Sequence, residues 1–215
     1  MITDACVFTN QDSAATPRRL VLTAKSCCIS RVILCGNAAD VPASYAGVTT
    51  LRGKIIGKQN SRTFPDAVRT SPKGCVVMVS AGENSFNRIA VSTKGVHLLT
   101  NIADLPKGGF DHVTAKMAAD HITGVVLDLS CIIHPRSRRT ALLRYAEILL
   151  LQRKYHFPLV IASGAEDLFG IKNVAETIAL CSLFGMTRAE VYAAQNSLDA
   201  VLSPSMPVTI VVVEP

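Results

Sequence analysis

The chain alternates short apolar runs with longer amphipathic stretches along most of its length. The runs are nearly continuous in Val, Ile, Leu and Cys, which is typical of strands covered on both faces, as in parallel sheets. We expect strands at Asp4–Phe8, Arg31–Cys35, Thr50–Ile56, Cys75–Ser80, Val96–Leu99, Gly124–Leu129 and Pro158–Ala162. We expect helices at Pro17–Ser26, Phe64–Thr70, Ser85–Ser92, His112–His121, Arg138–Tyr155, Lys172–Phe184 and Arg188–Ser197.

This alternation predicts the α/β class, either a (β/α) barrel or an open doubly wound sheet. No Gly-x-Gly-x-x-Gly follows the first predicted strand, and no glycine loop ends in Lys-Ser or Lys-Thr, so nucleotide-binding signatures are missing. Fitting so many units into 215 residues favours a small, tightly connected TIM-like barrel. We expect one compact domain over residues 1–206, with residues 207–215 as an apolar tail or an extra strand.

Composition limits the class of protein and the cellular compartment that the chain can be expected to belong to. Hydrophobic residues make up 49% of the chain, which is enough to bury a sizeable core. No apolar run approaches the roughly 20 residues that cross a bilayer, and the N-terminal sequence lacks a signal peptide pattern. We therefore expect a cytoplasmic protein with no membrane partner. The seven cysteines form no Cys-x-x-Cys pair and are predicted to be reduced, mostly in the core, at Cys6, Cys35, Cys75, Cys131 and Cys181.

The net charge of +6 is concentrated in one third of the chain. Residues 51–95 contain eight basic and two acidic side chains, whereas the remainder is nearly neutral. Such a segment either forms a surface that attracts a polyanion or makes an ordinary solvated face. Its basic residues are Arg52, Lys54, Lys58, Arg62, Arg69, Lys73, Arg88 and Lys94.

A second basic cluster is the sequence HPRSRR at His134–Arg139, which follows the predicted strand Gly124–Leu129. We expect a loop here at the end of the barrel where binding residues gather, suited to phosphate or carboxylate. The alternative is a capped, solvated helix start. In the helix that follows, a core stripe is predicted from helical spacing at Leu142, Leu143, Ala146, Leu149 and Leu150.

The residues that could carry chemistry give no catalytic pattern. The five histidines are scattered and match no metal-binding signature. Ser163 precedes Gly164 but lacks the glycine two residues before it that a nucleophile elbow requires. Asp128, Glu166 and Asp167 follow strands and could act as acid and base, or could cap helices and pair with arginines. We assign no catalytic residue.

Four blocks between about Asn84 and Pro204 match a known family in order and spacing. They are NRIAVSTKGVHLL at Asn87–Leu99, GFDHVTAK at Gly109–Lys116, Leu129-Ser130 followed by RSRRTALLRY, and the stretch from Phe157 that ends in Phe184-Gly185-Met186. They resemble protein component 3 of archaeal ribonuclease P, a relative of the eukaryotic thirty-kilodalton subunit. The family is related to PHP-type metal-dependent phosphoesterases. The first 80 residues match only weakly.

The resemblance implies a TIM-like barrel that serves as a non-catalytic protein subunit of ribonuclease P, which removes the 5′ leader from precursor tRNA. The RNA subunit would perform the chemistry with magnesium, and the protein would bind no cofactor of its own. Its partners would be that RNA, protein component 2 and other protein subunits, with precursor tRNA contacted indirectly. The family match points to RNA contacts at Arg88, Lys116, Arg139, Arg144 and Lys172, and local charge adds Lys107, Arg136 and Arg138.

Within the matched blocks, Asp111 and His112 agree with the family. Asp111 is as well explained as a helix N-cap as by contact with RNA.

Two stretches depart from the family pattern. Many members begin with Asp-x-His-x-His, where this chain has Asp4-Ala5-Cys6-Val7-Phe8, so we expect no metal centre. Members also carry Arg-x-Pro-Arg and an acid after the Ser-x-Ala turn. This chain has Lys172-Asn173-Val174-Ala175-Glu176, which lacks the second arginine and predicts weaker RNA contact there.

Two other functions remain open. The chain could be an independent PHP-like phosphoesterase with a site rebuilt from His112, His134, Asp128 and Glu166. It could also be a small-molecule barrel enzyme whose Arg136–Arg139 segment grips a phosphorylated substrate.

Overall fold

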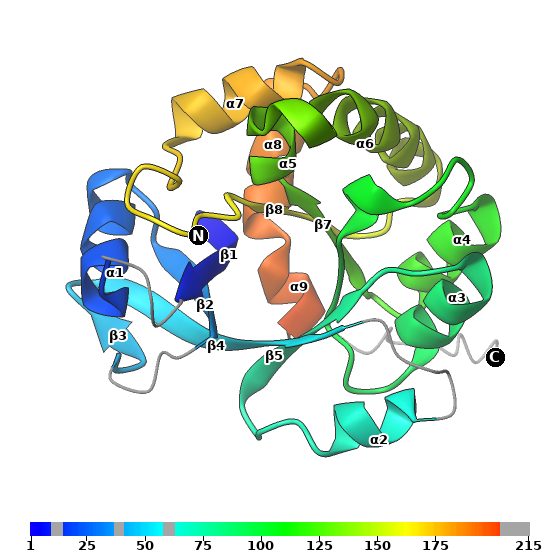
Figure 1. The fold of residues 1–215 in the computed structure, drawn as a ribbon, viewed down its shortest axis with the longest axis horizontal. Helices are drawn as coiled ribbons and strands as arrows, with labels where there is room; N and C mark the ends of the chain where they lie inside the picture. The colour runs from blue at the N-terminus through cyan, green and yellow to red at the C-terminus, as the bar shows by residue number, and fades with distance from the viewer. Residues whose placement is uncertain (10–14, 37–40, 58–62, 203–215) are drawn as a thin grey trace, which may run out of the picture.

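A curved, mostly parallel sheet organises the computed structural model, which describes residues 1–9, 15–36, 41–57 and 63–202 (Figure 1). Neighbouring strands follow the order β1-β2-β4-β5-β6-β7-β8, and the short β3 pairs antiparallel with β4. The strands are β1 (Thr3–Thr9), β2 (Arg31–Gly36), β3 (Ser44–Tyr45), β4 (Val48–Ile56), β5 (Cys75–Ser80), β6 (Leu98–Thr100), β7 (Gly124–Asp128) and β8 (Leu159–Ala162). All seven strands expected from the sequence are confirmed, and β3 was missed.

The two ends of the sheet meet where the residues that follow β8 lie beside the carboxyl-terminal half of β1. Val7 bridges Ala165, the Phe8 amide donates to the Ala165 carbonyl at 2.8 Å, and the Gly164 amide donates to the Cys6 carbonyl at 3.2 Å. These few bonds close the sheet into a barrel, which confirms the predicted TIM-like fold. We call this contact the β1–β8 seam.

Helices surround the barrel, as Figure 1 shows, and connect its strands. They are α1 (Pro17–Ser26), α2 (Phe64–Arg69), α3 (Asn84–Ser92), η1 (Ile102–Asp104), α4 (His112–Asp120), α5 (Ser130–Ile133), α6 (Pro135–Tyr155), α7 (Val174–Ser182), α8 (Arg188–Asn196) and α9 (Leu198–Leu202). Their buried faces pack on the outside of the strands. Within the described ranges, no helix combines the length and apolar character that a membrane span needs.

The interior of the barrel is filled by side chains, and α9 covers its amino-terminal end. Cys6, Cys35, Met78 and Val126 belong to the same buried cluster as Leu198 and Val201 of α9. A methyl group added at Gly124, the first residue of β7, would lie 3.2 Å from Val201. In the described part of the chain, the barrel is therefore closed at this end and open toward the carboxyl ends of its strands, where binding sites of such folds form.

Two predicted helix starts need correction. The segment His134–Arg139 is not a loop, because α6 begins at Pro135, where the ring presets the helical backbone. Conversely, the helix expected from Lys172 begins only at Val174. Asn173 and Glu176 form a capping box that fixes this start: the Asn173 side chain accepts from the Glu176 amide at 3.0 Å, and the Glu176 carboxylate accepts in return at 2.9 Å.

The core stripe predicted for α6 is also partly wrong. Leu143 and Leu150 are 57% and 65% exposed, and the fully buried positions include Ala141, Tyr145 and Ile148. Tyr145 sets this orientation, because its hydroxyl donates to the Asp128 carbonyl at 2.8 Å while its ring packs against Phe184. A pattern based on leucines could not reveal that an aromatic residue faces the core.

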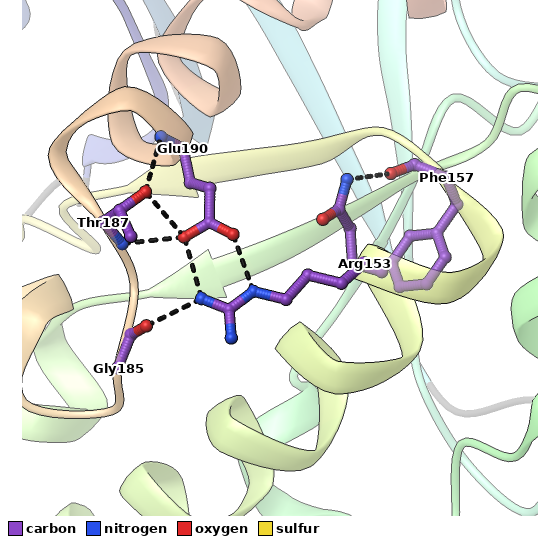
Figure 2. A network of polar contacts seen from close by, with 6 residues as sticks. Arg153, Phe157, Gly185, Thr187 and Glu190 are labelled. Atoms are coloured by element: carbon purple, nitrogen blue, oxygen red, sulfur yellow. Dashed lines mark hydrogen bonds and ion pairs between the residues drawn. The ribbon is translucent and has the colours of Figure 1, made fainter.

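A polar network fastens the end of α6 to the start of α8 (Figure 2). Arg153 donates to both Glu190 carboxylate oxygens at 2.7 and 3.0 Å and to the Gly185 carbonyl at 2.9 Å. Glu190 also accepts from the Thr187 amide at 2.7 Å as part of a capping box. Hydrogen bonds from Arg153 and Thr187 outweigh burial and lower the pKa of Glu190 to about 2.

Candidate RNA interface

The carboxyl ends of β7 and β8 place one aspartate against a tight turn. Asp128 Oδ1 accepts from the Ser130 amide at 2.9 Å and from the Ser130 hydroxyl at 2.7 Å. Gly164 follows β8 with φ of +63°, and a Cβ there would collide with Asp128 and lie 2.7 Å from Ser130 Oγ. Only glycine fits this position. Burial raises the pKa of Asp128, and the bonds from Ser130 oppose the rise.

A second aspartate completes the β1–β8 seam. Asp4 Oδ1 accepts from the Ser163 amide at 2.8 Å and from the Cys6 amide at 3.4 Å. At the seam, the Asp4 carboxylate thus accepts the hydrogen bond that a backbone carbonyl would accept between two ordinary strands. Burial raises the pKa of Asp4 to about 6, against the lowering effect of the Ser163 and Cys6 bonds. One oxygen of each carboxyl group is thus bonded within the fold, whereas Asp4 Oδ2 has no partner among the described residues.

A cleft of about 520 Å³ lies above these residues at the open end of the barrel. We call it the mouth cleft. Its titratable lining residues are Asp128, His134, Glu166, Asp167 and Lys172. Three carboxyl groups against one lysine and one histidine make this cleft a weak attractor for phosphate.

The donors at the mouth do not fit the metal centre that the PHP relationship would imply. On β1, Phe8 offers no ligand atom, and the Cys6 thiol lies 3.4 Å from Cys35 Sγ. This contact, together with burial, holds the pKa of Cys6 well above its usual value, so the thiol stays protonated. No group of three or more His, Cys, Asp or Glu side chains in the described ranges could hold a metal ion.

A different hollow, of about 700 Å³, has a basic lining. Arg18, Arg52 and Lys73 line it together with apolar and neutral residues, and none of its lining residues that the structure describes is acidic. We call it the basic groove. Arg52 and Lys73 are exposed and have no ion pair within the described ranges, while the Arg18 guanidinium lies 5.8 Å from the Tyr45 ring centre. Arg52 and Lys73 would offer positive charge to phosphate oxygens here.

The path of the chain between β2 and β4 explains why this surface carries charge. Its described part contains β3 where a parallel crossover usually has a helix. Helix α1 packs near Val48 at the start of β4, and α2 packs near Ile56 at its end. The outer face between them is left to Arg52 and Lys54, which are exposed while Leu51 and Ile55 face the interior.

Two further features shape the groove. Arg52 pairs in register with Cys75, which brings Lys73 and Gly74 alongside it. On the other side, the Thr50 amide donates to the Ala43 carbonyl at 2.9 Å and anchors the wall formed by residues 41–43. The groove is therefore supported by the sheet itself.

Four of the RNA contacts expected from the sequence are freely exposed. Arg136 and Arg139 lie on the first turns of α6, Lys107 lies between η1 and α4, and Lys116 lies on α4. None of them has a hydrogen bond or ion pair to another residue that the structure describes. They stay predicted contacts.

Two other expected contacts use part of their hydrogen-bonding capacity on the protein. Arg138 donates to the Ile132 and Ile133 carbonyls, both at 2.8 Å, and so caps α5. Lys172 Nζ donates to the Phe169 and Gly170 carbonyls at 2.7 and 2.9 Å inside the mouth cleft.

The last two expected contacts form ion pairs. Arg88 lies 2.6 Å from Asp111 Oδ2, while Asp111 caps α4 by accepting from the Thr114 amide at 2.9 Å. Against the effect of burial, these bonds lower the pKa of Asp111 to about 2. The N-cap role expected for Asp111 is confirmed. Arg144 is only 15% exposed, pairs with Glu147 and donates to the Leu105 carbonyl at 2.8 Å, so its contacts are structural.

The basic segment 51–95 is divided by the fold. Arg69 pairs with Asp66 at 2.9 Å, and Lys94 lies exposed near the start of β6. Lys58 and Arg62, like the tail 207–215, lie outside the described residues. The sequence named Arg52 and Lys73 within a segment that could attract a polyanion, but it did not separate them from the other basic residues or predict the groove. The sequence feature that could have identified the groove is the alternation of polar and apolar residues over Thr50–Ile55.

Comparison with protein families gives one clear match. The model of the family "RNase P subunit p30" matches residues 1–204. Among curated relatives, ribonuclease P protein component 3 of Methanococcoides burtonii is 36% identical over 118 residues, which cover 54% of this chain and 48% of that protein. The corresponding protein of Methanosarcina barkeri is 27% identical over 196 residues, which cover 87% of this chain and 82% of the relative.

Solved structures support the fold. A chain in the cryo-EM structure of archaeal ribonuclease P with mature tRNA has a TM-score of 0.75 and 17% identity, covering 99% of this chain and 98% of its own. Histidinol phosphate phosphatase of Lactococcus lactis, solved with zinc, L-histidinol and phosphate, has a TM-score of 0.56 and 8% identity, covering 86% and 94%. The same barrel therefore occurs in a ribonucleoprotein and in a zinc-bound phosphatase.

Proposed function

The chain belongs to the RNase P subunit p30 family, and we propose that it acts as a protein subunit of ribonuclease P that supports the catalytic RNA. The enzyme removes the 5′ leader from precursor tRNA. The names of the relatives support this role, as does the distribution of charge on the barrel.

The observation that carries the proposal is the basic groove. A barrel enzyme for a small phosphate ester would place its cations at the open end of the barrel, over the strand ends. Here the mouth cleft is lined by three carboxyl groups, and the cationic surface, whose described lining residues include no acid, lies on the outer face of β4. Such a surface suits RNA backbone, whose affinity for proteins comes chiefly from phosphate neutralisation and counterion release.

The protein's part in the reaction would be to bind the RNA and to hold it in its folded form. Arg52 and Lys73, with the exposed Arg136 and Arg139 of α6, would contact phosphate oxygens and keep the RNA folded. The chemistry would belong to the RNA and its magnesium ions, because Asp4 and Asp128 are occupied with backbone and Ser130. Protein component 2 and other subunits would complete the particle, with precursor tRNA contacted through the RNA.

Reconstitution tests the proposal. The cognate catalytic RNA and protein component 2 are combined with and without this chain, and precursor tRNA cleavage is measured at limiting magnesium. We expect the chain to raise the cleavage rate and to lower the magnesium needed. Equal rates in both mixtures would show that the chain does not serve this enzyme.

Binding measurements with the isolated chain separate the other two functions. We expect salt-sensitive binding to the RNA and no saturable binding of a small phosphate ester. Turnover of a phosphate ester by the isolated protein, abolished in the His134→Gln variant, would favour the phosphoesterase instead.

A further inference from the structure

Two buried oxygen atoms without hydrogen-bond partners line one small cavity beside the β1–β8 seam. They are Asp4 Oδ2 and Gln195 Oε1, and neither has a partner within the described part of the chain. Asp4 is 5% exposed and Gln195 is 4% exposed. Both residues line a cavity of about 10 Å³, which is room for one water-sized body. We call it the Asp4 cavity.

Two threonine hydroxyl groups line the same cavity but direct their protons elsewhere. Thr3 Oγ1 donates to the Met1 carbonyl at 3.2 Å, and Thr177 Oγ1 donates to the Asn173 carbonyl at 2.9 Å. The Ser163 hydroxyl accepts from the Ala165 amide at 3.2 Å, and the Ser163 side chain also hydrogen-bonds to the Asp4 carboxyl group. The threonine oxygens keep free lone pairs while their protons are used outside the cavity. Asp4 Oδ2, Gln195 Oε1 and the threonine oxygens are thus acceptors that a positive or proton-donating guest would satisfy.

The charges around the cavity define that guest further. The other carboxylate oxygen of Asp4 already accepts from the Ser163 amide. Lys172 also lines the cavity, but its ammonium donates to the Phe169 and Gly170 carbonyls at 2.7 and 2.9 Å. The Asp4 carboxylate therefore makes no ion pair with a described residue, and proteins usually pair a buried charge.

We propose that the Asp4 cavity binds one monovalent cation of sodium size, held by Asp4 Oδ2, Gln195 Oε1 and the neighbouring hydroxyl oxygens. A single positive charge neutralises the single carboxylate. Magnesium keeps several of its waters, and calcium takes six to eight oxygen ligands, for which this cavity has no room. The inference is independent of the proposed function.

The bound cation would join elements that are far apart in the sequence. Asp4 belongs to β1, Ser163 follows β8, Thr177 belongs to α7 and Gln195 to α8. A shared ion would brace the seam at which only a few backbone bonds close the barrel. Its loss would therefore appear as lower thermal stability.

Thermal unfolding of the full chain tests the site. Tm is measured in sodium, potassium and choline chloride at equal ionic strength and neutral pH. Sodium at about ten times its Kd should raise Tm by about 3 to 6 °C over choline. The Asp4→Asn variant should lose this difference, whereas Asp120→Asn, at an exposed position on α4, should keep it. Equal Tm in sodium and choline, or a sodium effect that survives in Asp4→Asn, would overturn the proposal.

The Gln195→Glu variant separates a cation from a simpler arrangement. If the Gln195 amide were turned so that its nitrogen donates to Asp4, this variant would place two carboxylates together and lower Tm in every salt. If a cation is bound, the added carboxylate should strengthen the sodium effect, while calcium should still have no effect because the cavity has no room for its ligands. A uniform loss of Tm with no salt rescue would contradict the cation site.

Discussion

The mouth cleft and the basic groove are hollows on one barrel whose charged side chains have different tasks. At the mouth, Asp128 bonds to Ser130 beside Gly164, which no other residue can replace, and Lys172 bonds to the Phe169 and Gly170 carbonyls. In the groove, Arg52 and Lys73 have no ion pair among the described residues. The difference shows that charged side chains near strand ends can be used to stabilise the fold. Charged side chains on a strand face that no helix covers stay available to bind a partner.

The largest expected effect concerns the stability of the mouth. Gly164→Ala should lower the free energy of unfolding by about 3 kcal/mol, because it adds a methyl group against Asp128 and requires a left-handed backbone. Denaturant unfolding measures this. Gly185→Ala is the matched control, since Gly185 has φ of +88° but nothing lies within 4 Å of an added methyl group. It should cost about 1 kcal/mol. Equal losses would mean that the turn is not packed as described.

A paired test on α6 separates structural from RNA-binding arginines. Arg144→Met should lower the free energy of unfolding by about 2 kcal/mol, because the Leu105 carbonyl loses its donor. Its affinity for RNA should not change once the protein is folded. Arg139→Met should leave stability unchanged and weaken RNA binding by a few fold. Denaturant unfolding and RNA titration are run on both variants. The reverse assignment would show that the contacts of Arg144 do not define its role.

The smallest effect concerns the network of Figure 2, which lies outside both regions. The folded pKa of Glu190, about 2, lies below its ordinary value of 4.5. Its contribution is therefore present above pH 4.5 and is lost as pH falls toward 2. Glu190→Gln should reduce the loss of Tm over this pH window and leave RNA affinity unchanged. An unchanged pH profile in the variant would mean that Arg153 does not stabilise the ionised carboxylate.

The sequence predicted the barrel because its apolar runs are long enough to define every main strand. It could not predict β3, since Ser44 and Tyr45 carry no strand pattern of their own. It placed Arg144 on the surface because helical spacing does not show that a guanidinium reaches the Leu105 carbonyl. The Asp4 site depends on Ser163, which is 159 residues away in the chain, and no local pattern contains such a contact.

The position of the basic groove could be predicted in part from the sequence. The concentration of charge in residues 51–95 pointed to the right segment. Which members of that segment remain free depended on pairing with Asp66 and Asp111, and only the folded structure shows this. Arg18 joins the groove from a separate helix, where its sequence neighbours give no sign of it.

One titration tests the central claim that the groove, and not the mouth, is the RNA face. The affinity of the cognate RNA for Lys73→Gln and for Lys172→Gln is measured over a series of salt concentrations, with Arg52→Gln/Lys73→Gln as the stronger groove variant. Each substitution removes one lysine or arginine charge. The double variant should lose affinity and reduce the salt slope by about 2, and Lys73→Gln by about 1. Lys172→Gln should match the wild type. A larger loss in Lys172→Gln than in Lys73→Gln would place the RNA at the mouth and contradict the account.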